Sequence, residues 1–161
     1  STGTYTNSAI FNYPEALNVA DYSISLSTGD DMVTNGDFSS SSSWSEGTDW
    51  TISGGNATHA SGSSGYLNQD ITFVEGDTYA ITFDISSWTT GNFYLANHLP
   101  DAATLILTTG VATGDTVTRY WEQGSSTLTE LKLYGNDIFD GSIDNVIVKK
   151  VNSETLTITA K

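Results

Sequence analysis

The sequence predicts an all-β protein, an antiparallel β-sandwich of the jelly-roll type. Apolar and polar residues alternate with a period of two along many short segments, as strands with one buried face require. Breakers that contain Gly, Asn or Asp separate these segments at the spacing typical of sandwiches. Serine and threonine supply 21 and 24 of the 161 residues, against two prolines, and threonine suits the pleated surface of a sheet.

The strands can be placed one by one from the alternation. The clearest covers residues 78–85, where Tyr79, Ile81 and Phe83 share a face and the residues between them share the other. Residues 14–20 form the one predicted helical turn. Gly-containing turns are predicted at 54–55, 75–77, 113–115, 135–137 and 140–141. The other predicted strands, in chain order, are 22–26, 31–35, 49–53, 56–60, 66–74, 92–98, 103–108, 116–122, 127–134, 142–151 and 155–160.

Two packed sheets bury one face of each strand, so the alternation also predicts the core. The residues predicted to lie mostly inside are Phe38, Trp44, Ile71, Phe73, Tyr79, Ile81, Phe83, Leu131, Leu133, Val146 and Val148.

The chain divides into three predicted parts. Residues 31–151 form the jelly roll, residues 1–30 an N-terminal arm, and residues 152–161 an extra C-terminal strand. The arm holds a small apolar cluster: Ile10, Phe11, Tyr13 and Leu17. We expect this arm to dock on another subunit, and the alternative is an extra edge strand with a loose end.

The charge distribution limits the kinds of molecule that this protein can bind. The formal net charge is −14, and residues 1–118 hold thirteen acidic side chains without one Lys or Arg. Such a surface repels nucleic-acid phosphates and anionic membranes, and no run of eighteen apolar residues could span a bilayer. Neutral sugars, divalent cations and a basic protein surface remain, beside the plainer interpretation of an acidic surface that keeps the protein soluble.

Other sequence signals add little to these constraints. The chain opens without the basic and apolar segments of a secretory signal, which favours either a mature secreted protein or one made in the cytoplasm. Cysteine is absent, and the two histidines, His59 and His98, belong to no known catalytic motif. Nineteen acidic residues could supply a glycosidase pair, but carboxylates in turns usually serve the turn. We therefore expect a protein without catalytic residues.

A frame of motifs encloses the predicted sandwich. Asn35-Gly36-Asp37-Phe38, with Trp44 close behind, opens it, and Gly-Ser-Ile-Asp-Asn-Val at 141–146 closes it. This frame resembles the jelly-roll carbohydrate-binding modules of families four, nine and twenty-two. It also resembles small non-catalytic domains of tailed-phage virions, and the fuller run through 50–58, 63–69 and 76–79 looks most like those. The resemblance covers residues 32–151. It also implies that Trp44 and Trp50 lie in the core, because the relatives bury an aromatic residue after this opening motif.

The resemblance implies two alternative functions. One is a structural protein on a virion surface, as a capsid decoration or a tail or fibre accessory. Such a protein would contact other virion proteins or itself, for example as a trimeric homo-oligomer, and could bind host-surface glycans. The other is the carbohydrate-binding module of a secreted polysaccharide-degrading enzyme, or an extracellular adhesin.

The resemblance also implies a structural Ca²⁺ ion. The relatives join the first strand to the last with such an ion, and its ligands here would be the main-chain oxygens of Asp37 and Gly55 and the Asp144 carboxylate. All are hard oxygen donors, which suit Ca²⁺. Ser39 departs from the relatives, several of which carry an acid there. The alternative is that Asp144 caps local backbone amides without a metal.

Sugar-binding jelly rolls stack aromatic side chains on sugar rings, and amides or carboxylates bond the hydroxyls. The aromatic candidates implied here are Trp88, Tyr94, Trp121 and Tyr134, and for each the alternative is burial in packing or in an interface. The amide candidates are Gln123 and Asn136, with Asn92 and Asn97 also close in sequence.

Overall fold

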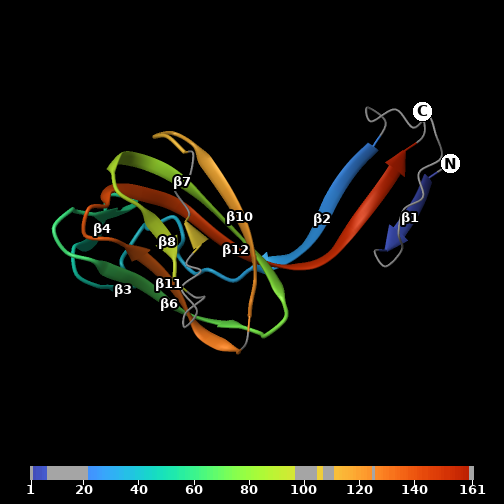
Figure 1. Ribbon diagram of the computed structural model, residues 1–161, viewed down its shortest axis with the longest axis horizontal. Coiled ribbons are helices and arrows are strands. Elements are labelled where there is room, and N and C mark those ends of the chain that lie inside the picture. Colours follow the sequence, from blue (N-terminus) through green and yellow to red (C-terminus); the bar gives the residue numbers. More distant parts are fainter. Residues whose placement is uncertain (1, 7–21, 97–104, 107–110, 125, 160–161) are drawn as a thin grey trace.

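The protein is an all-β sandwich of two antiparallel sheets, as its sequence predicts (Figure 1). The computed structural model describes residues 2–6, 22–96, 105–106, 111–124 and 126–159. The predicted helical turn at 14–20, the apolar cluster of the arm and His98 lie outside these residues. Within them, no helix is long and apolar enough to cross a membrane.

Each sheet has its own strand order. The first runs β10-β7-β12-β5-β4 and the second β3-β6-β11-β8-β9, with every pair antiparallel. The first sheet is built from β10 (Thr116–Glu122), β7 (Thr78–Thr90), β12 (Asp140–Thr159), β5 (Asn56–His59) and β4 (Trp50–Ser53). The second is built from β3 (Ser45–Glu46), β6 (Gly65–Phe73), β11 (Leu128–Gly135), β8 (Phe93–Leu95) and β9 (Leu105–Ile106).

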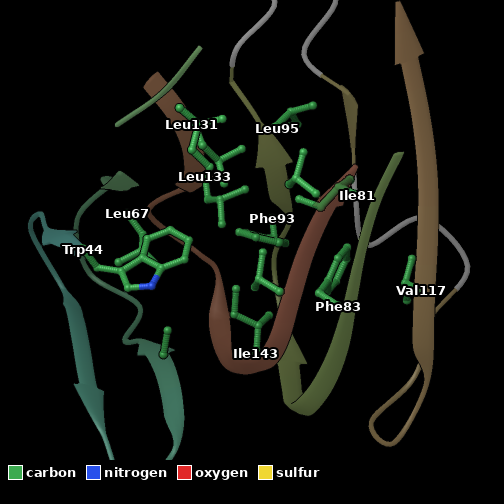
Figure 2. Close-up of a cluster of buried hydrophobic side chains, with 14 of the residues drawn as sticks. Trp44, Leu67, Ile81, Phe83, Phe93, Leu95, Val117, Leu131, Leu133 and Ile143 are labelled. Atoms are coloured by element: carbon green, nitrogen blue, oxygen red, sulfur yellow. The ribbon is translucent and has the colours of Figure 1, made fainter. Parts of the chain in front are cut away.

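The core lies between the two sheets, and Figure 2 shows side chains from both meeting there. Ile81, Phe83 and Ile143 come from the first sheet, and Leu67 and Leu133 from the second. Every residue predicted to be inside is buried, including Trp44 at 8% and Trp50 at 4% exposure. The sequence therefore identified part of the core, while other buried residues, such as Phe93, Phe139 and Trp121, were not among those predicted.

An arm extends away from the sandwich (Figure 1). It consists of β1 (Thr2–Thr6), β2 (Tyr22–Asp31) and residues 151–159 of β12. Both β1 and β2 pair antiparallel with this end of β12. The two strands predicted at 142–151 and 155–160 are thus one continuous strand, which passes from the sandwich into the arm.

The Asn-Gly-Asp-Phe motif is a turn, so the strand predicted at 31–35 is wrong. Asn35 adopts a left-handed φ of 56°, and its side-chain amide donates to the carbonyl oxygens of Ser40 at 2.5 Å and Ser42 at 3.1 Å. The buried Gln69 side chain bonds both the amide and the carbonyl of Thr34 at 2.8 Å. Side-chain hydrogen bonds therefore replace the sheet ladder here.

Gly36 joins this turn to the last strand. Val146 N donates to Gly36 O at 2.9 Å, and a Cβ added at Gly36 would lie 2.0 Å from Val146 O. Only glycine permits this approach of two backbones. The two ends of the sequence frame are thus in direct contact.

Candidate functional site

Three tyrosines form a row across the second sheet. Tyr134 of β11 is paired in register with Tyr66 of β6 on one side and with Tyr94 of β8 on the other. The ring centroids are 5.0 Å apart for Tyr66 and Tyr134 and 5.8 Å apart for Tyr94 and Tyr134. We call these residues the tyrosine row. They form one continuous aromatic strip.

The alternation of the strands places this row on the outer face of the sheet. Along β6, residues 65, 67, 69, 71 and 73 are buried, and the residues between them are partly or fully exposed. Leu133 of β11 and the two ends of β8 are likewise buried. Tyr66 is 40% exposed, and Tyr94 and Tyr134 are half-buried. The aromatic strip therefore faces away from the core.

A hollow of about 420 Å³ adjoins the row on the same sheet. Its volume falls within the usual range for small-molecule sites. Tyr66 belongs to both features, and Asn68 contributes a side-chain oxygen that is buried and unpaired among the described residues. A ligand or water donor that reaches this oxygen would satisfy it. The described residues that line the hollow are Tyr66, Asn68, Ala96, Leu128, Thr129, Glu130 and Lys132.

The hollow contains an ion pair. Lys132 Nζ lies 3.0 Å from Glu130 Oε2, and both side chains are a little over 40% exposed. In register, Lys132 faces Asn68 and Glu130 faces Asp70, which is exposed. An ammonium donor and a carboxylate acceptor thus lie side by side next to the aromatic strip. Hydroxyl groups can bond with both.

The structure corrects two of the predicted sugar contacts. Trp121 is 8% exposed and stacks on Tyr79 within the core, at a centroid distance of 5.4 Å. Gln123 is 3% exposed, and its Nε2 donates to Ser126 O at 2.9 Å. Trp121 shares the inward phase of β10 with Val117, and Gln123 comes directly after the strand and is buried as well, so neither presents a surface to a ligand.

Trp88 and Asn136 hold loops rather than joining the row. Trp88 is partly buried against the core, and its Nε1 donates to Gly91 O at 3.2 Å. Asn136 Oδ1 accepts from Asn92 N at 3.2 Å, which ties the start of β8 to the turn after β11. Of the six predicted sugar contacts, the structure brings Tyr94 and Tyr134 together in the row.

The proposed calcium ligands lie near the frame contact. The main-chain oxygen of Asp37 is 3.9 Å from the Cβ position at Gly55, so these two residues are neighbours. The bond from Val146 N to Gly36 O holds the strand that carries Asp144 against the same loop. Asp144 Oδ1 accepts from Asn145 N at 2.6 Å, as expected of a backbone cap. No cluster of three acidic, His or Cys side chains occurs among the described residues. The donors are all oxygens, which is compatible with Ca²⁺, and the calcium site stays a prediction.

The outer face of the first sheet carries a different polar cluster. Asp84 Oδ1 accepts from Thr116 Oγ1 at 2.5 Å, and Asp84 Oδ2 accepts from Asn145 Nδ2 at 2.8 Å. These hydrogen bonds hold the pKa of Asp84 below its ordinary value, and the bond from Thr116 has the larger effect. Nearby on β10, Tyr120 is 52% exposed, but it lies outside the tyrosine row.

Sequence reasoning missed Tyr66, Asn68 and the ion pair of Glu130 with Lys132. A signal for Tyr66 was present, because it precedes Leu67 in an alternating strand and so belongs to the polar phase. The partners across the sheet were not readable, since register depends on tertiary pairing.

Comparisons with known proteins concern the fold. Among solved structures, the chain is similar to the enzymatically active domain of tailspike protein 4 of bacteriophage CBA120, with a TM-score of 0.50 and 17% identity. That match covers 75% of this chain, which spans 21% of the tailspike chain. A second match is a family 29 carbohydrate-binding module from Piromyces equi, with a TM-score of 0.25 and 14% identity over 86% of this chain and 90% of the module. No family model and no curated protein matches the sequence. The tailspike match shows a shared fold, without extending that domain's activity to this chain.

Proposed function

We propose that this chain is a non-catalytic structural protein of a phage virion, a capsid decoration or a tail or fibre accessory, which binds glycans of the host surface. The observation that carries the glycan-binding part is the tyrosine row beside the hollow. Tyr66, Tyr134 and Tyr94 offer an aromatic strip, and the hollow adds a donor and an acceptor beside it. Aromatic side chains supply large contact area with few torsions to freeze, which favours binding.

The virion context rests on other support. The motifs at 35–38, 50–58 and 63–69 look most like those of virion domains. The arm adds a three-stranded extension outside the sandwich, and a free-standing sugar-binding module has no need of one. We assign the arm to assembly, with other virion proteins or with further copies of the chain.

A second candidate is the carbohydrate-binding module of a secreted polysaccharide-degrading enzyme or adhesin. The same tyrosine row favours it, because both candidates require a glycan surface. The genes on either side decide between them. Capsid, portal or tail genes would support the virion protein, and a glycoside hydrolase gene would support the module.

Glycan binding is tested by substitution in the middle of the row. Tyr134→Ala removes the ring that contacts both neighbours, and Tyr120→Ala is the matched control because it truncates an exposed tyrosine of the other sheet. On a printed glycan panel, we expect Tyr134→Ala to weaken binding roughly tenfold or more, as loss of an anchoring aromatic does. Equal binding by both variants and the wild type would reject the row as the site.

A further inference from the structure

We propose that Glu130 selects uncharged glycans by neutralising Lys132 in the hollow, an inference that rests on the proposed glycan-binding function. Of the described residues that line the hollow, Lys132 is the one cation. Its Nζ lies 3.0 Å from Glu130 Oε2. The ammonium that could pair with a uronate, sialate or sulfate group is therefore already paired.

The charges around the ion pair also disfavour acidic ligands. Asp70 faces Glu130 across β6 and β11, and it is exposed on the same outer face. Among the residues that the structure describes, two carboxylates thus accompany one ammonium here, within a chain of net charge −14. Like charges placed across an interface oppose binding, so an anionic ligand meets local and long-range repulsion.

A neutral sugar meets no such penalty. Its hydroxyl groups can accept from Lys132 and donate to Glu130 without breaking the ion pair. The ion pair then contributes two charge-assisted hydrogen bonds, which are stronger than neutral ones. The discrimination between neutral and acidic glycans therefore depends on both members of the ion pair. Removal of either one should change which of these two classes is bound.

The test uses the full chain and four proteins: wild type, Glu130→Gln, Lys132→Gln and the double variant. Both side chains are over 40% exposed, so the isosteric change Glu130→Gln and the shortening change Lys132→Gln should each leave the melting temperature within a few degrees of wild type. The panel holds neutral oligosaccharides of glucose, mannose, galactose, xylose and N-acetylglucosamine. Each is matched with an oligosaccharide of similar length that carries uronate or sulfate groups.

The expected result is that wild type retains neutral oligosaccharides alone. Glu130→Gln should gain acidic ones, shifting the acidic-to-neutral ratio roughly tenfold, in line with one charged hydrogen bond. The double variant should lose that gain because it lacks the ammonium. If wild type binds acidic oligosaccharides as well as neutral ones, or if Glu130→Gln gains no acidic ligand, the proposed selection by Glu130 is wrong. The proposed glycan binding would still stand in both cases. If wild type binds neither class, the proposed function itself fails.

Discussion

The contact between Gly36 and Val146 supports a quantitative prediction about Gly36→Ala. The added Cβ would lie 2.0 Å from Val146 O and 3.1 Å from Val33 Cγ1. Val146 is 1% exposed and belongs to the core, so its backbone cannot move away without disturbing the packing. Forced overpacking costs about 1–3 kcal/mol. The hydrogen bond from Val146 N to Gly36 O would be lost at about 1 kcal/mol more.

The free energy of unfolding should therefore fall by about 2–4 kcal/mol. For a chain of this length, each kcal/mol lowers the melting temperature by about 2–4 °C, which gives a decrease of roughly 4–16 °C. Urea unfolding followed by tryptophan fluorescence measures it. Trp44 is a local reporter because its Nε1 donates to Asn35 O at 3.0 Å, one residue from the substitution.

Gly54→Ala is the matched control. Gly54 has a φ of 61°, and nothing lies within 4 Å of its Cβ position, so it tests left-handed backbone strain without a clash. That strain costs about 1–2 kcal/mol. If Gly36→Ala destabilises the protein no more than Gly54→Ala does, the two ends of the frame are not pressed together as described.

Three further predictions concern acid stability, calcium and assembly. Because the folded-state pKa of Asp84 is lowered, its ionised form stabilises the fold above the unfolded-state value, and this contribution is lost as pH falls through the folded-state pKa. Thr116→Val should therefore reduce the loss of unfolding free energy that the protein shows as pH falls into the acid range. An unchanged pH dependence would contradict the role given to the bond between Thr116 and Asp84. Calcium at a hundredfold excess over Kd should raise the free energy of unfolding of the wild type by about 2.7 kcal/mol, but not that of Asp144→Ala. A wild-type melting curve that EDTA leaves unchanged would exclude the calcium site. Residues 31–151 alone should fold but remain monomeric by light scattering, while the full chain associates; a monomeric full chain would show that the arm is simply part of the fold.

The sequence was sufficient to predict part of the core and most strands, but neither the whole core nor all of the strand boundaries. The period-two pattern identified Phe83 and Leu133 as buried without knowledge of pairing. By contrast, the same pattern predicted two strands where the structure has the single strand β12. The pattern is interrupted between Val151 and Ser153, where the pairing with β2 shifts its register while the strand continues. It also missed Ser45–Glu46, which is too short to show a period. Such features depend on the partner strand.

The same limit explains the mixed result for the sugar contacts. Along β10, Val117 and Trp121 share one phase and Tyr120 the other, and each phase contains aromatic residues. Sequence alone therefore does not say which tryptophan or tyrosine faces inward. The structure resolves it by stacking Trp121 on Tyr79, which leaves Tyr120 exposed.

The register that builds the core also builds the proposed binding surface. One residue before the tyrosine row along β11, Leu133 is paired with Leu67 and with Leu95, and all three are fully buried. Burial of this leucine row fixes the register of the three strands, because a slip by one residue would turn the leucines outward. The neighbouring residues on the opposite face are then necessarily Tyr66, Tyr134 and Tyr94. Packing inside the sandwich thus aligns the aromatic strip outside it, and the strip requires no interaction of its own to stay in line.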